Sequence, residues 1–250
     1  MNRSLWLQSL SKTYCPPWPC SVCGKGNVAL VNGSLTEHET ADSKEGRKHD
    51  AWDPDWITYG FTAWAQCQHP KCKQRFAIAG TGGVGPDQDD EGNIGWQDFF
   101  DPSYCFPAPR MIAVPGKCPE DVRVELDAAF SLYWSQPAAS AGRLRVALEL
   151  LLNRQGVPKR KRDRGGKYKD LWLHARLDLF AKSNPATAAQ LMALKSLGNS
   201  GAHEGTISKS DLLDAFEVLE HALEEIIEQR TKRVAALTKQ LTRKHGKKAK

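Results

Sequence analysis

The chain has 250 residues, enough for one sizeable domain and a small one, and its hydrophobic content of 40% and charged content of 26% are ordinary for a globular protein. No run approaches the roughly 18 consecutive apolar residues of a membrane span, and the short, interrupted apolar segment at the start excludes a signal peptide. A cytoplasmic protein is therefore expected. Its seven cysteines cannot all pair within one chain, so those in CxxC spacing are interpreted as reduced metal ligands.

Positive charge is concentrated in two segments. Residues 230–250 contain nine Lys or Arg and no Asp or Glu, so the other 229 residues carry a net charge of −3. An internal run, residues 158–169, has a net charge of +6. Both segments are expected to be solvated and flexible, the internal one as a loop between helices. Because clustered charge favours a polyanion, nucleic acid is the expected partner of the basic tail and of the 158–169 loop.

Two cysteine pairs dominate residues 1–80, which we interpret as a zinc-ribbon domain. Cys20 and Cys23 form a CxxC turn, and Gly24 lets the backbone bend beneath the two sulfurs. Cys67 and Cys72 form the second pair, whose two additional residues still permit a turn. Four thiolates complete tetrahedral Zn²⁺ with no open position. The expected cofactor is therefore a structural zinc bound by these four cysteines.

Neighbouring residues leave alternatives open. Cys15 and His69 are rival zinc ligands, although two prolines after Cys15 stiffen its approach to the site. Cys105 and Cys118 stand alone in the sequence and are expected to be packing residues.

The stretch between the cysteine pairs contains a polar insert, Glu37–Asp50, which is expected to be an excursion between two strands. Three tryptophans follow: Trp52, Trp56 and Trp64. Aromatic rings near a zinc ribbon can stack on bases or form a small core. The core interpretation is favoured because small domains are short of buried area.

Residues 81–118 change in character. A Gly- and Asp-rich polar stretch begins at Thr81, and prolines between Pro102 and Pro109 disfavour helix and favour extended chain. The apolar side chains of Tyr104 and Phe106 indicate packing against another part of the protein. We expect a linker followed by an extended arm.

From Pro119 the pattern becomes helical. Pro119 suits a first helical position, and Ser208 with Asp211 resembles a helix start. Apolar residues at three-four spacing predict helices at Val122–Tyr133, Leu144–Leu152, Leu171–Phe180, Pro185–Leu194 and Leu212–Ile226. The predicted fold class is α+β, mainly α: residues 119–229 form an antiparallel helical bundle after the zinc ribbon, and residues 230–250 are a basic tail.

A group of polar residues lies between the last two predicted helices. Asn199 and His203 are four residues apart and share a face if helical geometry persists. A histidine can act as general acid or base near neutral pH, and an asparagine can orient a phosphate or ribose. A structural interpretation is favoured from the residues alone: Asn199 satisfies carbonyls at a helix end, and His203 caps the bend.

The segment Leu197–His203, read with the leucine stripes around it, resembles the prokaryotic domain-of-unknown-function family 4145. That family is similar to the HEPN helical superfamily, whose active members are metal-independent ribonucleases in toxin–antitoxin and phage-defence systems. The resemblance implies a HEPN-like helical domain, and a homodimer is the expected assembly. The upstream ribbon and the proline-containing arm also resemble full-length members, so the similarity covers most of the chain.

Active HEPN proteins often carry the motif Arg-Asn-x-x-x-His. Asn199 and His203 match this motif, but Gly198 occupies the position of the arginine that would stabilise the scissile phosphate. Lys195, about one helical turn earlier, could supply charge but not a bidentate fork. An arginine at position 198 would restore the charge of the superfamily motif.

Three functions are compatible with these features of the sequence. The leading hypothesis is a non-catalytic HEPN-like module that binds nucleic acid or a partner of a defence system. The first rival is a metal-independent RNA endonuclease in which His203 is the general acid or base, while Asn199 and Lys195 position the phosphate. The second rival is a scaffold that contacts protein alone.

Overall fold

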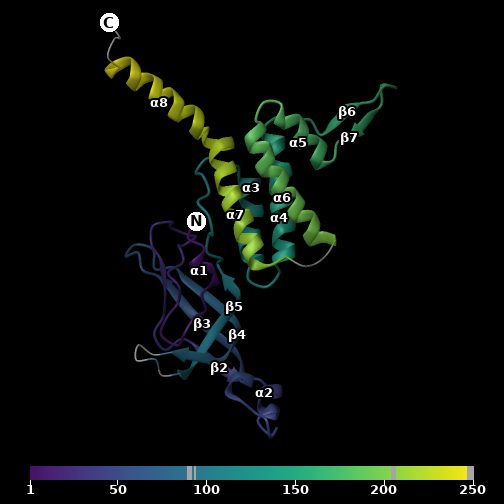
Figure 1. Ribbon diagram of the computed structural model, residues 1–250. Helices are drawn as coiled ribbons and strands as arrows, with labels where there is room; N and C mark the ends of the chain where they lie inside the picture. Colours follow the sequence, from purple (N-terminus) through teal and green to yellow (C-terminus); the bar gives the residue numbers. More distant parts are fainter. Residues whose placement is uncertain (89–91, 93, 204–206, 247–250) are drawn as a thin grey trace. The chain divides into compact units, whose positions relative to one another are not determined.

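The computed structural model describes residues 1–88, 92, 94–203 and 207–246 (Figure 1). It is an α+β protein that divides into two compact units, each made from two stretches of chain. The first unit joins Met1–Met111 to Asp127–Ser140, and the second joins Ile112–Leu126 to Ala141–Lys250. In the described residues, no helix is both long enough and apolar enough to cross a bilayer.

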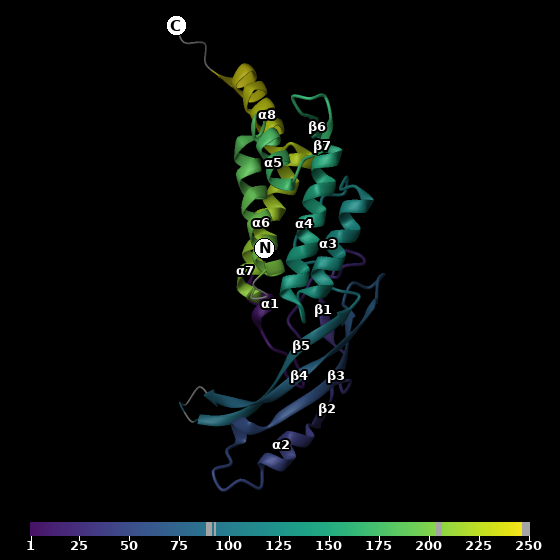
Figure 2. The ribbon, with the colours of Figure 1, turned by 90° about the vertical axis from the view of Figure 1, so that its right-hand side faces the viewer.

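The first unit is built on an antiparallel sheet that curls along its length (Figure 2). Its strands are β1 (Val28–Leu30), β2 (Thr36–Glu39), β3 (Thr58–Cys67), β4 (Arg75–Gln88) and β5 (Ile94–Phe106). They lie in the order β1-β3-β4-β5, and β2 pairs with the other half of β3. Short helical turns complete the unit: α1 (Ser4–Leu7), α2 (Ala41–Gly46) and η1 (Pro54–Trp56). The polar insert Glu37–Asp50, predicted to be an excursion between two strands, therefore contains most of β2 and the whole of α2.

The long β4–β5 hairpin occupies much of the segment expected to be a linker. Glycines are needed inside it because the neighbouring chain approaches closely. A Cβ atom at Gly80 would lie 2.1 Å from the carbonyl oxygen of Asp101, and one at Gly82 would lie 2.5 Å from that of Phe99. The register also shifts between Ala79 and Gly80, as in a β-bulge. Glycines that looked like linker composition therefore serve close strand packing.

Tryptophans do form the core of the first unit, but not the ones expected. The rings of Trp6 and Trp18 are stacked with centroids 6.3 Å apart, and Trp134 lies 4.9 Å from Trp18. The Nε1 group of Trp18 donates a hydrogen bond to the carbonyl oxygen of Leu5 at 2.8 Å. Trp56 and Trp64, which were expected in a core, are instead 44% and 48% exposed.

The second unit is mostly helical, and its helices α4, α6 and α7 run side by side (Figures 1 and 2). Its elements are α3 (Glu120–Leu132, shared with the first unit), α4 (Pro137–Arg154), α5 (Leu173–Ala181), α6 (Pro185–His203), α7 (Lys209–Leu223), a π-helical turn η2 (Glu224–Glu228) and α8 (Arg230–His245). Leucines and alanines at the predicted spacing are fully buried, among them Leu144, Leu148, Leu191, Leu212 and Leu219.

Local signals explain where α7 starts. Ser208 accepts a hydrogen bond from the Asp211 backbone amide, and the Asp211 carboxylate accepts one from the Ser208 backbone amide. This reciprocal capping box confirms the start predicted from the sequence.

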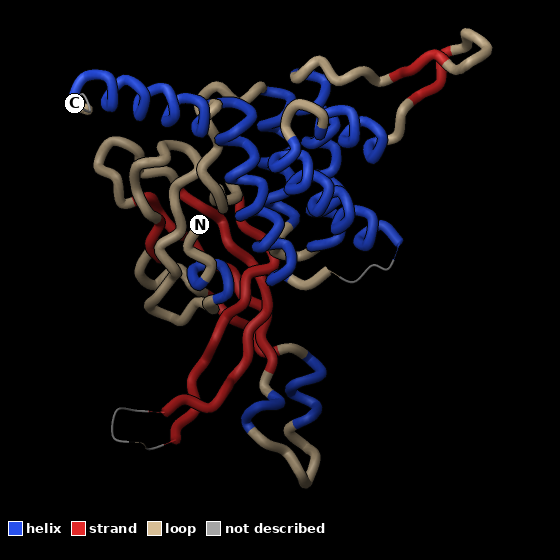
Figure 3. Tube along the Cα trace, turned by 45° about the horizontal axis from the view of Figure 1, so that its top comes forward, coloured by secondary structure: helices blue, strands red, loops and turns tan. Residues whose placement is uncertain are grey.

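Two segments of the second unit differ from the sequence prediction. Residues 158–169 are not an irregular loop, because β6 (Arg160–Arg162) and β7 (Tyr168–Asp170) pair as an antiparallel hairpin (Figure 3). Most of the basic tail is the helix α8, which has no buried residue. In α8, apolar residues at helical spacing, Val234, Leu237 and Leu241, lie between the cations. In the hairpin, Gly166 has a φ of +79° and Asp163 accepts hydrogen bonds from the turn amides, so the turn brings the two strands together.

Candidate functional site

Four cysteines of the first unit form a cluster that can hold a metal ion. The sulfur atoms of Cys20, Cys23, Cys67 and Cys72 all lie within 4.8 Å of one another. The Sγ atoms of Cys20 and Cys72 are 3.8 Å apart, and those of Cys23 and Cys67 are 3.7 Å apart. A tetrahedral ion with metal–sulfur bonds of about 2.3 Å requires sulfur–sulfur separations of about 3.8 Å, so these distances fit such an ion.

Two turns bring the four sulfurs together. In the first, the Cys20 amide donates to the carbonyl oxygen of Gly26 at 2.8 Å, and the Gly24 amide donates back to Cys20 at 2.9 Å. Gly24 has a φ of +60°, which favours glycine. In the second, Cys67 ends β3 and the Cys72 amide donates to the His69 carbonyl oxygen at 3.0 Å.

Gly26 permits the two turns to meet. A Cβ atom at this position would lie 2.7 Å from the Sγ atom of Cys67 and 2.7 Å from the Cβ atom of His69. Such distances are far inside normal contact, so any side chain here would push the second turn away from the first. Gly26 is a site residue that the sequence analysis missed, although a glycine three residues after a CxxC pair is a usable signal.

The electrostatics of the cluster differ from one thiol to another. Burial raises the pKa of Cys67 to about 12, and burial also raises the pKa of Cys20. The pKa of Cys23 is lowered to about 6, chiefly because the backbone amide of Lys25 donates to its sulfur. A cation at the centre of the cluster would favour all four thiolates and so offset the cost of burying them.

The rival ligands lie outside the cluster. Cys15 is buried, and its thiol donates to the carbonyl oxygen of Pro16 at 3.5 Å. The backbone amide of His69, rather than its imidazole, contacts the Cys67 sulfur at 3.4 Å. Cys105 and Cys118 are buried, as expected of packing residues.

The polar constellation of the second unit involves a partner that the sequence did not indicate. Arg145 of α4 donates a hydrogen bond from its guanidinium to the side-chain oxygen of Asn199 on α6. Arg145 also lies 3.9 Å from Glu149. Arg145 and Asn199 are 54 residues apart in the sequence, so no local motif could have paired them.

Gly198 allows this contact between α4 and α6. It is buried, and a Cβ atom there would lie 3.3 Å from both the carbonyl oxygen of Ala141 and the Cβ atom of Arg145. The position that carries arginine in the superfamily motif therefore faces the backbone of α4. Lys195 is partly buried one turn earlier. The backbone of His203 ends α6, but its side chain lies outside the described residues.

A basic ribbon, residues 158–170, extends from the second unit. Every residue of β6 and β7 is exposed. Asp163 organises its turn, because one carboxylate oxygen accepts from the amides of Gly165 at 2.9 Å and Lys167 at 3.0 Å. The guanidinium of Arg162 lies 5.0 Å from the ring centre of Tyr168.

The ribbon combines charge with exposed aromatic rings. Tyr168 is 62% exposed, and Trp172, two residues beyond the ribbon, is 82% exposed. Two of the ribbon's seven basic side chains are ion-paired, Arg160 with Asp170 and Lys169 with Asp163. Among the described residues, the other five have no carboxylate within 4.0 Å of their charged nitrogens.

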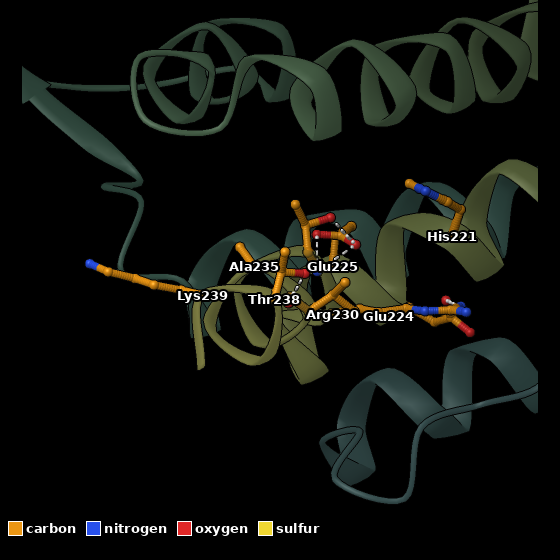
Figure 4. A pocket seen from close by; sticks show the side chains of 9 residues that line it. His221, Glu224, Glu225, Arg230, Ala235, Thr238 and Lys239 are labelled. Atoms are coloured by element: carbon orange, nitrogen blue, oxygen red, sulfur yellow. Dashed lines mark hydrogen bonds and ion pairs between the residues drawn. The ribbon is translucent and has the colours of Figure 1, made fainter. Parts of the chain in front are cut away.

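A separate groove of about 630 Å³ lies where α7 turns through η2 into α8 (Figure 4). Arg230 is paired with Glu224 beside it, and the hydroxyl of Thr231 donates to Glu225 at 2.8 Å. The apolar side of α8 continues from this groove: Val234, Leu237 and Leu241 are each at least half exposed. The groove contains none of the predicted metal ligands or catalytic residues, although Arg230 and Lys239 on its wall belong to the basic tail that was predicted to bind nucleic acid.

Comparisons with known proteins give families without an assigned activity. Residues 127–244 match the family described as domain of unknown function DUF4145, and residues 8–105 match the one described as domain of unknown function DUF8608. The expected resemblance to DUF4145 is thus confirmed for residues 127–244, whereas residues 8–105, which were expected to resemble the same family, match a different one. No curated protein and no solved structure matches the chain.

Proposed function

We propose that this protein binds nucleic acid without cleaving it, through the basic ribbon of a HEPN-like helical module, while a structural zinc holds the first unit together. The proposal rests on the structure of the basic ribbon, residues 158–170. An exposed two-stranded ribbon with a local excess of cations and two exposed rings offers phosphate contacts and stacking surfaces at the same place. A role in phage defence or in a toxin–antitoxin system is the biological setting that the family resemblance favours.

Zinc is the metal proposed for the four-cysteine cluster. Four thiolates are the donor set of structural zinc, and the sulfur separations of 3.7 and 3.8 Å suit its tetrahedral geometry. All four coordination positions would be filled by protein. The ion would therefore stabilise the fold and would have no open position for substrate.

Two contacts favour binding over catalysis. The side-chain oxygen of Asn199 accepts a hydrogen bond from Arg145. That atom is therefore already used to join α4 to α6. The arginine of the superfamily motif is replaced by a glycine that packs against the backbone of α4. In this interpretation the constellation stabilises the bundle, and the expected homodimer stays a prediction.

One observation favours the alternative function, a metal-independent RNA endonuclease. Arg145 brings a guanidinium to Asn199 from a different helix, so the charge missing at position 198 is present in space. An arginine can hold a scissile phosphate with two parallel hydrogen bonds. Under this alternative, Arg145 and Asn199 would position the phosphate, and His203 would transfer the proton.

The test is oligonucleotide binding at several salt concentrations, with fluorescently labelled RNA and duplex DNA of mixed sequence. The ribbon variant Lys161→Gln/Arg164→Gln removes two exposed cations that have no acidic partner among the described residues. Each lost phosphate contact should reduce the log–log salt slope by about 0.9 on duplex DNA and about 0.7 on a single strand. The matched control, Lys44→Gln/Lys182→Gln, removes two exposed cations outside the basic ribbon.

Three results decide the proposal. A weaker affinity and a shallower slope in the ribbon variant, with neither change in the control, support it. Equal losses in both variants would mean that net charge alone drives binding. No binding by the unmodified protein would favour the protein-only scaffold. A chain ending at Gln229 measures the separate contribution of α8, which should also be salt-sensitive.

A further inference from the structure

Where β3 and β5 end, one face of the first unit's sheet carries three exposed aromatic rings close together. Trp64 of β3 is 48% exposed, and on β5 Tyr104 is 51% and Phe106 is 63% exposed. We call Trp64, Tyr104 and Phe106 the aromatic face. Neighbouring residues of the same strands, such as Ala65 and Cys105, point the other way and are buried in the core. Exposed rings gathered on one surface mark an interaction site rather than a packing defect.

The strand register places these rings around a floor of alanines. Trp64 pairs with Ala77 of β4, and Ala77 pairs with Phe106, so two rings flank one methyl group. In the next row Ala79 pairs with Tyr104. Because adjacent strands are about 4.8 Å apart, Trp64 and Phe106 stand about 10 Å apart across the strand between them. Small alanine side chains thus lie between larger exposed rings on this face of the sheet, an arrangement that we call the trough.

The charges around the trough suit an anion. From Cys67 to Gly80 the chain contains three Lys or Arg and no Asp or Glu. Arg75 pairs with Gln66 and stands two residues before Ala77, which places it on the same face of the sheet. Counted back from Phe106, the first acid of β5 is Asp101, which lies beyond Tyr104 and accepts a hydrogen bond from the hydroxyl of Ser9 at 2.5 Å.

We infer that the aromatic face binds single-stranded nucleic acid, whose bases stack on Trp64, Tyr104 and Phe106 while Arg75 contacts phosphate. Unpaired bases expose flat surfaces of the size of these rings, and exposed aromatics on a sheet are an established means of stacking them. A duplex keeps its bases stacked internally and cannot use the trough. This inference deepens the proposed nucleic-acid binding by specifying single strands, and it uses a surface different from the basic ribbon.

The experiment compares a labelled 12-nucleotide single-stranded RNA with a duplex of the same sequence, using the full chain. The variant Trp64→Ala/Tyr104→Ala/Phe106→Ala removes exposed side chains and should fold normally. It should lose about 5- to 100-fold affinity for the single strand for each base that no longer stacks, and little for the duplex. Its salt slope should stay unchanged, whereas Arg75→Gln should reduce the slope by about 0.7.

Two further variants separate stacking from general hydrophobicity. Trp56→Ala/Trp96→Ala removes two rings of similar exposure, 44% and 51%, that lie outside the trough, and should bind as the unmodified protein does. Trp64→Phe/Phe106→Tyr keeps flat rings in place and should retain most of the affinity. Quenching of tryptophan fluorescence by the single strand should weaken in Trp64→Phe.

The outcomes distinguish this inference from the proposal about the ribbon. Single-strand binding that falls in the aromatic-face variant supports the inference, whether or not the ribbon contributes. Single-strand binding that the aromatic-face variant retains, but the ribbon variant loses, overturns the inference and leaves the proposed function standing. No binding of either oligonucleotide by the unmodified protein overturns both.

Discussion

The guanidinium of Arg145 donates a hydrogen bond to the side-chain oxygen of Asn199, and this contact joins α4 to α6. It forms beside Gly198, where the absence of a side chain lets the two helices approach. A polar residue of the superfamily motif is thus held by a residue from another helix. The same contact fits a structural interpretation, in which it ties α4 to α6, and a catalytic one, in which it places a cation beside Asn199.

A double-mutant cycle measures what the contact contributes to stability. Arg145→Met and Asn199→Ala should each lower the free energy of unfolding by about 1 kcal/mol, because Arg145 is partly exposed and the net value of such a bond is modest. The two losses should not add, and the coupling energy should be at least about 0.5 kcal/mol. Urea unfolding of the four proteins supplies these values. Additive losses would show that the two side chains act independently.

Gly198 should reject the arginine that the superfamily motif carries. A side chain at this position must push against the Ala141 carbonyl oxygen, only 3.3 Å from the position of its Cβ atom. We expect Gly198→Arg to lower the free energy of unfolding by about 1–3 kcal/mol, the usual cost of overpacking, and to produce no new RNA cleavage. The sequence alone suggested that this substitution would restore the motif's charge. Unchanged stability together with new nuclease activity would support that earlier interpretation.

The cluster of four cysteines shows which features the sequence could predict. Cysteines in CxxC-like spacing carry their own signal, so Cys20, Cys23, Cys67 and Cys72 were identified without any knowledge of the fold. The helices were equally predictable, because burial of one helix face makes apolar residues recur about every 3.6 residues. Both patterns depend only on the spacing of residues along the chain, so they can be recognised in a single sequence.

Features that depend on long-range pairing could not be predicted. The β4–β5 hairpin contains glycines that resemble linker composition, and only the approach of Asp101 and Phe99 explains them. The contact between Arg145 and Asn199 spans 54 residues and has no periodic signature. Exposure of Trp64 likewise depends on which face of β3 meets the core, and that choice follows from the strands beside it.

Gly26 gives a direct test of how the two cysteine turns meet. Gly26→Ala should lower metal content, because its methyl group would occupy the space of the Cys67 sulfur, 2.7 Å away. Gly60→Ala is the matched control, since a Cβ atom at Gly60 has no neighbour within 4 Å. Metal per chain after purification, measured by elemental analysis, should be near one zinc in the control and clearly lower in Gly26→Ala.

Cys20→Ser and Cys72→Ser should remove the metal and expose the first unit to protease while the helical bundle stays folded. Structural zinc contributes on the order of 10 kcal/mol to the folding of a small site, so its loss should be evident as cleavage within residues 1–111. Full metal content in a variant that lacks all four cysteines would refute the site.

His203 decides between binding and cleavage. For a binding module, unmodified protein should cleave RNA no faster than a preparation purified in parallel from cells without the gene, at neutral pH and in the presence of chelator. His203→Ala should then leave oligonucleotide affinity unchanged within about twofold, a difference of roughly 0.4 kcal/mol. His221→Ala is the matched control, because His221 lies on α7 and contacts Gln190.

For a nuclease, His203→Ala should abolish RNA cleavage, and Arg145→Gln should reduce it strongly. Chelation should not affect cleavage, because the proposed proton transfer uses side chains. Cleavage in chelator that depends on both His203 and Arg145 would overturn the binding proposal and establish the endonuclease.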